Sequence, residues 1–201
     1  MNEPLPDYEI DELRNKILDA AEKRFTTYGY GKTTMAEIAE DSDMSAANLY
    51  RYFQNKQDIA AECAERCMCS LNTRLREATL QSKMTAAERL HTFAIEAYYY
   101  HLEMGKESPK IKELVDFISE KHQSMVKERI QAQVSLIAEI LAYGNQTGEF
   151  AVQDVVNTAK TIYTTLIFFD VPSFTSLYNK EEFESKARDV VNLLIEGIRK
   201  R

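Results

Sequence analysis

The scarcity of turn-forming residues is the feature that most constrains how this chain can fold. Only 6 glycines and 4 prolines occur among its 201 residues, so few positions favour a turn. Apolar residues recur at the three- and four-residue spacing of helices, whereas strands would show alternation. We therefore expect an all-α protein of about nine helices.

The composition narrows the class of protein further. Hydrophobic residues make up 44% and charged residues 28%, as in folded proteins rather than disordered or membrane-embedded ones. The first ten residues are acidic and contain two prolines, unlike a signal peptide, and no apolar run is long enough to span a bilayer. We expect a cytoplasmic protein without a membrane partner.

Charge limits how such a protein could bind nucleic acid. The formal net charge is −7 and the sequence pI is about 5.2, so binding cannot depend on the charge of the whole molecule. Any contact with DNA must be local.

Three cysteines, Cys63, Cys67 and Cys69, lie in one short segment, which is unlike a secreted disulfide framework. Cys63 and Cys67 are four residues apart and could offer two thiolate ligands or a redox pair. No further cysteine or nearby histidine completes a metal site. We favour half-buried free thiols, because unpaired cytosolic cysteines usually behave as small hydrophobes, and we expect no metal and no cofactor.

Capping patterns place the N-terminal helices. One apolar stripe runs over residues 13–28 and ends at Gly29. Thr34 and Glu37 fit a capping box, because the threonine hydroxyl and the carboxylate can each accept from the other residue's backbone N–H. This pattern predicts a short helix that ends near residue 41.

A second short helix follows after a tight turn. Ser45 is a good N-cap for a helix that reaches about residue 53, and only residues 42–44 separate it from the preceding helix. Two short helices joined in this way form a helix-turn-helix pattern. Asn55 is then the expected N-cap of a long helix that ends near residue 81.

The remaining helices are marked by similar signals. Thr85 and Glu88 repeat the capping box and open a helix that ends near Gly105. Ser108 and Pro109 fit the N-cap and first position of another helix. The expected spans of the helices that follow it are about 126–144, 154–169 and 180–200.

The segment from Thr33 to Ile59 resembles the DNA-binding signature of TetR/AcrR-family transcriptional regulators. That signature has paired threonines, Ile-Ala, a turn followed by serine, Leu-Tyr, an aromatic residue, phenylalanine and a lysine that opens the next helix. The matching residues are Thr33, Thr34, Ile38, Ala39, Ser45, Leu49, Tyr50, Tyr52, Phe53 and Lys56. With the first helix, the resemblance covers about residues 13–60, and the rest resembles the family in length and helical layout.

The resemblance implies a homodimeric regulator, a repressor released from double-stranded operator DNA by a small apolar or aromatic effector. A helix-turn-helix domain would span residues 1–54, with a short disordered arm at 1–9. Effector binding and dimerisation would fall to residues 55–201.

The residues expected to meet DNA surround the second short helix. Its first turn would enter the major groove, where Asn48 could pair with an adenine edge. Tyrosine hydroxyls, and Lys56 at the start of the long helix, could bind phosphates. The full expected set is Lys32, Thr34, Ser45, Ala46, Ala47, Asn48, Tyr50, Arg51, Tyr52 and Lys56.

Two features of this segment favour rival interpretations. Asp43 stands in the turn where the family often has glycine, although aspartate tolerates a left-handed backbone. Between residues 11 and 60, seven lysines and arginines face nine aspartates and glutamates. A helical protein-interaction module with lost or weak DNA binding is therefore an alternative. An enzyme is disfavoured, because no nucleophile, base and orienting group occur at a readable spacing.

Two further sets of residues are candidates for the C-terminal part. Aromatic and methionine side chains could line an effector pocket or simply fill the core: Phe93, Tyr100, Met104, Phe117, Met125, Tyr163 and Phe168. Apolar stripes on the last two helices could form a four-helix dimer interface or complete the core of one chain: Val155, Ala159, Ile162, Leu166, Val190, Leu194 and Ile198.

Overall fold

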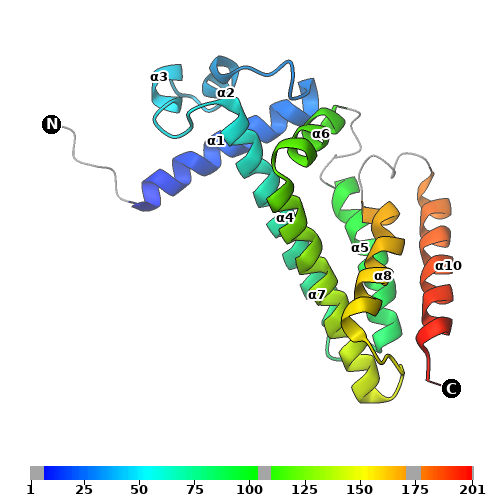
Figure 1. Ribbon diagram of the computed structural model, residues 1–201. Helices are drawn as coiled ribbons and strands as arrows, with labels where there is room; N and C mark the ends of the chain where they lie inside the picture. Colours follow the sequence, from blue (N-terminus) through cyan, green and yellow to red (C-terminus); the bar gives the residue numbers. More distant parts are fainter. Residues whose placement is uncertain (1–6, 104–109, 171–177, 201) are drawn as a thin grey trace. The chain divides into compact units, whose positions relative to one another are not determined.

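The computed structural model describes residues 7–103, 110–170 and 178–200 (Figure 1). Across these residues the regular structure is helical, apart from one antiparallel bridge between Phe150 and Arg199. The expected all-α fold is confirmed. The nine described helices are α1 (Asp7–Tyr28), α2 (Met35–Asp41), α3 (Ala46–Leu49), α4 (Lys56–Thr79), α5 (Ala86–Glu103), α6 (Ile111–Lys121), α7 (Gln123–Thr147), α8 (Val155–Asp170) and α10 (Lys180–Ile198).

Some sequence predictions meet the limits of this description. Met104 and the expected cap at Ser108 and Pro109 lie outside the described residues. Helix α1 already begins at Asp7, so residues 7–9 of the expected disordered arm are helical. None of the described helices has both the length and the apolar character needed to cross a membrane.

The chain divides into two compact units. The first comprises residues 1–67 and 108–123, and the second comprises residues 68–107 and 124–201. Helix α4 runs through both, and α6 belongs to the first. The expected functional boundary after residue 54 stays a prediction.

A single apolar core holds the first unit together. Ile17, Ala21 and Phe25 on α1 are fully buried, as the stripe predicted, whereas Tyr28 at the end of the helix is 53% exposed. The remaining buried members of this core are Leu18, Ile38, Ala39, Leu49, Phe53, Ile59, Ala60 and Cys63. Helices α2 and α3 are thus held by side chains of α1 and α4.

Capping interactions set where α2 begins and how it turns into α3. The capping box at Thr34 is confirmed, because its hydroxyl accepts from the backbone N–H of Glu37 and its own N–H donates to the Glu37 carboxylate. In the turn that follows, Asp43 has a φ of 54°. This is the left-handed conformation that glycine and, less readily, aspartate adopt.

Helix α3 is shorter than the sequence indicated. It ends at Leu49 rather than near residue 53. The backbone N–H groups of Arg51 and Tyr52 donate to carbonyls three residues earlier, so the chain tightens into turns before α4. The N-cap predicted at Asn55 is confirmed, because its side chain accepts from the backbone N–H of Asp58 at 3.0 Å.

The second unit contains a helical layer in which α5, α8 and α10 pack side by side (Figure 1). Tyr98 on α5 stacks on Phe183 of α10 with ring centroids 4.0 Å apart, and Phe169 of α8 meets the same ring edge-on at 5.2 Å. The second predicted capping box is confirmed at the start of α5, where Thr85 and Glu88 exchange hydrogen bonds. These aromatic contacts join the three helices in the core of the second unit.

Candidate nucleic-acid interface

The first turn of α3 is open and preorganised. The Ser45 hydroxyl accepts from the backbone N–H of Asn48 at 3.2 Å, which confirms the predicted N-cap. Ala46 and Ala47 are exposed and Asn48 is half-buried. Because methyl groups are small, a base edge can approach this turn closely, and Asn48 supplies an amide that can both donate and accept.

The residues around this turn differ in how freely they can reach a partner. Tyr50 is 54% exposed, and Lys32, Thr34 and Arg51 are also exposed. Tyr52 is half-buried and packs against the apolar core of the first unit. Four of these five side chains thus present polar groups to solvent, while Tyr52 is partly a packing residue.

Lys56 has a role that the sequence did not reveal. Its ammonium donates to the backbone carbonyls of Tyr30 and Thr33, both at 2.7 Å, and lies 4.4 Å from the centroid of the Tyr30 ring. Burial lowers the pKa of this ammonium, and the charge of Glu113 acts in the opposite direction. Two of its three N–H groups are therefore used to hold the segment before α2, which leaves one for a phosphate.

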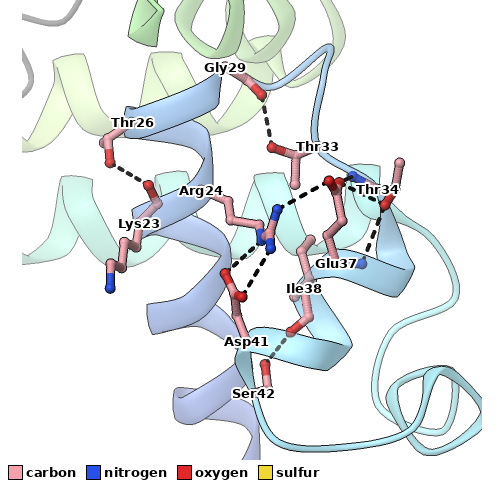
Figure 2. A network of polar contacts seen from close by, with 10 residues as sticks. All are labelled: Lys23, Arg24, Thr26, Gly29, Thr33, Thr34, Glu37, Ile38, Asp41 and Ser42. Carbon is pink, nitrogen blue, oxygen red and sulfur yellow. Dashed lines mark hydrogen bonds and ion pairs between the residues drawn. The ribbon is translucent and has the colours of Figure 1, made fainter.

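An arginine on α1 fixes the orientation of α2. Figure 2 shows the Arg24 guanidinium pointing from α1 toward the carboxylates of Glu37 and Asp41. Its Nε lies 2.6 Å from Asp41, its Nη2 3.0 Å from the same carboxylate, and its Nη1 3.3 Å from Glu37. Hydrogen bonds from Arg24 lower the pKa of Asp41, and hydrogen bonds from Thr34 lower the pKa of Glu37. Both carboxylates stay ionised at neutral pH and anchor the helix.

Internal ion pairs account for much of the acidic charge in this unit. Arg66 contacts Asp19 at 2.7 Å and Glu22 at 2.9 Å, and Lys16 contacts Asp43 at 2.9 Å. In contrast, Lys32 and Arg51 form no ion pair within the described part of the chain. Two cations next to the helix-turn-helix thus remain for a partner, although the unit as a whole is not basic.

Helix α6 supports the segment that leads into α2. The Glu113 carboxylate accepts from the backbone N–H of Gly31 at 2.8 Å, and a Cβ at Gly31 would lie 3.1 Å from that carboxylate. Phe117 stacks on Tyr30 with ring centroids 4.8 Å apart. The first unit thus includes a helix that is distant in sequence from the helix-turn-helix.

The candidate residues for the effector pocket lie in different units. Phe117 belongs to the first unit, whereas Phe93, Tyr100 and Tyr163 are buried in the second. The spacing of aromatic residues could not separate these two groups, because the Tyr30 partner of Phe117 lies far away along the chain. Among the other candidates, Met125 and Phe168 are half-buried.

The candidate dimer residues divide in a similar way. Ala159, Ile162 and Leu166 are at most 2% exposed within a single chain, so they contribute to the core of the second unit. Val155, Val190, Leu194 and Ile198 are partly buried. The well-exposed apolar side chains on α8 and α10 are instead Val156 at 56%, Ile167 at 38% and Leu193 at 76%.

The cysteines form no metal site in the described residues. Cys63 is buried and its thiol donates to the Leu18 carbonyl at 3.6 Å. Cys67 is half-buried and Cys69 is exposed, and the three cysteines form no disulfide within the described residues. No cluster of potential metal ligands occurs in residues 7–103, 110–170 and 178–200.

Comparison with known families decides the identity of this fold. The family described as "Bacterial regulatory proteins, tetR family" matches residues 17–63, and the "Tetracyclin repressor-like, C-terminal domain" matches residues 86–191. The chain belongs to the TetR family. This TetR-family protein is accordingly a DNA-binding transcriptional regulator, and its family is regulatory rather than enzymatic.

Individual proteins share this likeness over nearly their whole length. The fatty acid metabolism regulator protein of Bacillus subtilis is 23% identical over 185 residues, 91% of this chain and 94% of that protein. A transcriptional regulator from Cytophaga hutchinsonii has a TM-score of 0.75 at 24% identity, with 92% and 97% of the two chains covered. The fatty acid degradation regulator FadR from Bacillus halodurans has a TM-score of 0.70 at 19% identity, with both chains fully covered.

Proposed function

We propose that this TetR-family regulator is a cytoplasmic repressor that binds operator DNA as a homodimer and is released by a small apolar or aromatic effector. The observation that carries the DNA-binding half is the α3 turn, where Ser45 caps a helix whose exposed start presents Asn48. The second unit, with its buried aromatic side chains, is the part assigned to the effector. Two similar proteins are named regulators of fatty acid metabolism or degradation, which supports an apolar effector.

The DNA contacts divide into reading and positioning roles. Asn48 reads one base per half-site, because its amide matches the donor and acceptor of an adenine edge. Tyr50, Arg51 and Lys32 bind phosphates, since they are exposed polar groups around the same turn. Thr34 acts through the start of α2, because its hydroxyl and its N–H already donate to the Glu37 carboxylate. Ser45, Ala46 and Ala47 shape the approach to the groove, and Tyr52 and Lys56 contribute mainly by holding the turns in place.

A homodimer is proposed because one helix-turn-helix reads a half-site that is too short for useful specificity. The exposed Val156, Ile167 and Leu193 give α8 and α10 the apolar surface that such an interface needs. Light scattering at micromolar concentration measures this directly, and a monomeric mass would contradict it.

The internal ion pairs weaken the rival interpretation as a protein-interaction module. That rival was motivated by the acidic balance of residues 11–60, and Glu37, Asp41 and Asp43 in that region are paired with basic residues of α1. Binding should still weaken quickly with salt, because few cations remain for phosphates.

Effector binding and operator binding would each weaken the other, with a coupling free energy of about 1–3 kcal/mol.

Paired variants test the assignment of roles. Asn48→Ala should relax base preference by roughly 1–3 kcal/mol at one position per half-site. Arg51→Gln should weaken specific and random DNA alike and reduce the salt slope by about one for each phosphate that is no longer neutralised. Lys56 is unsuitable as the phosphate variant, because its loss would disturb the backbone at Tyr30 and Thr33.

The measurement is fluorescence anisotropy with the protein's own upstream DNA and a scrambled duplex, at several salt concentrations. Thermal unfolding of each variant serves as the control for folding. The assignment would be wrong if Asn48→Ala, like Arg51→Gln, weakened binding to the operator and to the scrambled duplex by the same factor. Equal affinity of the unaltered protein for both duplexes would contradict the proposed operator binding itself.

A further inference from the structure

A buried amide without a partner lies in the second unit. Gln133 on α7 is 1% exposed, and neither its Nε2 nor its Oε1 has a hydrogen-bond partner among the described residues. Buried polar side chains in folded proteins are nearly always paired, because an orphaned donor or acceptor is destabilising. The amide therefore calls for a functional explanation.

Other amides of this protein show that the fold satisfies such groups where they are structural. Asn145, on the same helix, donates to the Val152 carbonyl at 2.7 Å and accepts from the Val152 N–H at 2.9 Å. Even the exposed Gln81 donates to the backbone carbonyl of Glu77 one turn earlier. Gln133 does neither, although a helix offers it the same backbone carbonyls.

Arg89 is the other described residue with an orphaned side-chain atom, and packing explains it better. Its Nε is unpaired, but its Nη2 donates to the Gln81 carbonyl at 3.1 Å. Its guanidinium also lies 3.8 Å from the centroid of the Tyr143 ring. Gln133 differs because its entire hydrogen-bonding capacity is unused.

The surroundings of Gln133 on its helix are mainly apolar. Leu136 and Ile137, the next turn toward the C-terminus, are at most 2% exposed. Arg129 and Ile130, the turn before it, are half-buried. Ligand sites typically combine apolar walls with a few placed polar groups, and Gln133 is such a polar group among apolar neighbours on its helix.

We infer that Gln133 is the polar anchor of the effector site, and that the effector carries a neutral group with adjacent donor and acceptor, such as a carboxamide, on an apolar body. This inference rests on the proposed function and specifies its ligand class. A carboxamide can accept from Nε2 and donate to Oε1 together. A carboxylate offers acceptors only, so it would face Oε1 with negative charge and would have to be buried as an ion.

Three probes with the same butylphenyl body test this ligand class on the full-length protein. They are 4-butylbenzamide, 4-butylbenzoate and butylbenzene, which carries no polar group. Calorimetric titration should show the benzamide binding more tightly than either of the others. Gln133→Leu should weaken the benzamide by about tenfold, the loss expected for its hydrogen bonds, and leave butylbenzene unchanged. Gln131→Leu, which removes an exposed glutamine from the same helix, should behave like the unaltered protein.

Several results would overturn the inference. These are the same benzamide affinity in the Gln133→Leu protein as in the unaltered protein, tighter binding of the benzoate than of the benzamide, or binding of none of the probes.

Gln133→Met, closer in shape to glutamine, replaces the leucine variant if that protein does not fold. Both variants should unfold at or above the temperature of the unaltered protein, since the orphaned amide is removed. Lower unfolding temperatures for both would show that the amide is already paired, and would also overturn it.

Operator binding in the same preparations separates the ligand assignment from the repressor role. A protein that binds its operator but fails the probe test keeps the proposed function and loses the assignment of Gln133. A protein that binds the benzamide through Gln133 but shows no preference for operator DNA keeps the site and loses the proposed repressor role.

Discussion

Replacing Asp43 can separate backbone strain from charge at the turn between α2 and α3. This residue has a φ of 54°, and its carboxylate contacts Lys16 at 2.9 Å. Asp43→Asn removes the charge and keeps a side chain that tolerates the left-handed region. Asp43→Gly removes charge and strain together, and Asp43→Ala removes the charge while increasing the strain.

The expected effects on stability follow from the backbone. A left-handed alanine costs roughly 1–2 kcal/mol, and aspartate already bears part of this cost, so Asp43→Ala should lower the free energy of unfolding by about 1 kcal/mol. For a chain of this size that corresponds to a drop of about 2–4 °C in Tm. Asp43→Gly should stay within about 0.5 kcal/mol of the unaltered protein, because strain relief is offset by a more flexible unfolded chain. The ion pair with Lys16 contributes little, since both side chains are exposed.

The expected effects on operator binding follow a different order. All three variants remove a negative charge next to the proposed recognition helix. Two unit charges about 10 Å apart in water interact by about 0.4 kcal/mol, so the two half-sites of a dimer together gain about 0.8 kcal/mol. Operator affinity should therefore rise about fourfold at low salt for every variant, and the gain should shrink as salt screens it.

Urea unfolding measures the stabilities of the three Asp43 variants. Fluorescence anisotropy at two salt concentrations measures their operator affinities. If Asp43→Ala were as stable as Asp43→Asn, the left-handed backbone would not be the constraint at this turn. If none of the variants bound the operator more tightly at low salt, the carboxylate could not lie near a phosphate.

Two further predictions concern the stability of each unit. Gly144→Ala should lower Tm by several degrees, because a Cβ there would lie 2.1 Å from the ring of the buried Phe150 and displacing a packed ring costs about 1–3 kcal/mol; an unchanged Tm in a calorimetric scan would contradict this. The lowered pKa values of Glu37 and Asp41 mean that their contribution to stability is complete above their unfolded pKa values, near 4, and is lost as the pH falls through the folded ones. Arg24→Leu should flatten this acid dependence in urea unfolding between about pH 5 and 2, and an unchanged pH profile would show that Arg24 does not stabilise the ionised carboxylates.

The parts of this fold that the sequence predicts best depend on residues close together along the chain. The capping boxes at Thr34 and Thr85 and the N-caps at Ser45 and Asn55 each involve a partner three residues later. Such contacts are local, so the pattern of residue types is sufficient to place them. At Asp43 the family resemblance indicated a turn where glycine is common, and the residue adopts the left-handed backbone that aspartate tolerates.

Other features escaped because they depend on partners distant along the chain. Lys56 was expected to face phosphate, and only the fold brings it to the carbonyls of Tyr30 and Thr33. The excess of acidic residues between residues 11 and 60 is a similar case, because the sequence does not show that Asp41 is paired with Arg24. The apolar stripe that includes Ile162 predicts a helix face that is buried. A helix in the core of one chain and a helix in a dimer interface show the same stripe. Periodicity therefore cannot tell whether the same chain or a second chain buries this face.

The discontinuous first unit has a consequence for engineering hybrid regulators. A graft that transplants only the N-terminal helices onto another effector domain would leave α6 behind. The N–H of Gly31 would then lose its acceptor on Glu113, and the ring of Tyr30 would lose its stacking partner Phe117. Chimeras of this protein should therefore exchange residues 110–121 together with the N-terminal segment, through two junctions rather than one.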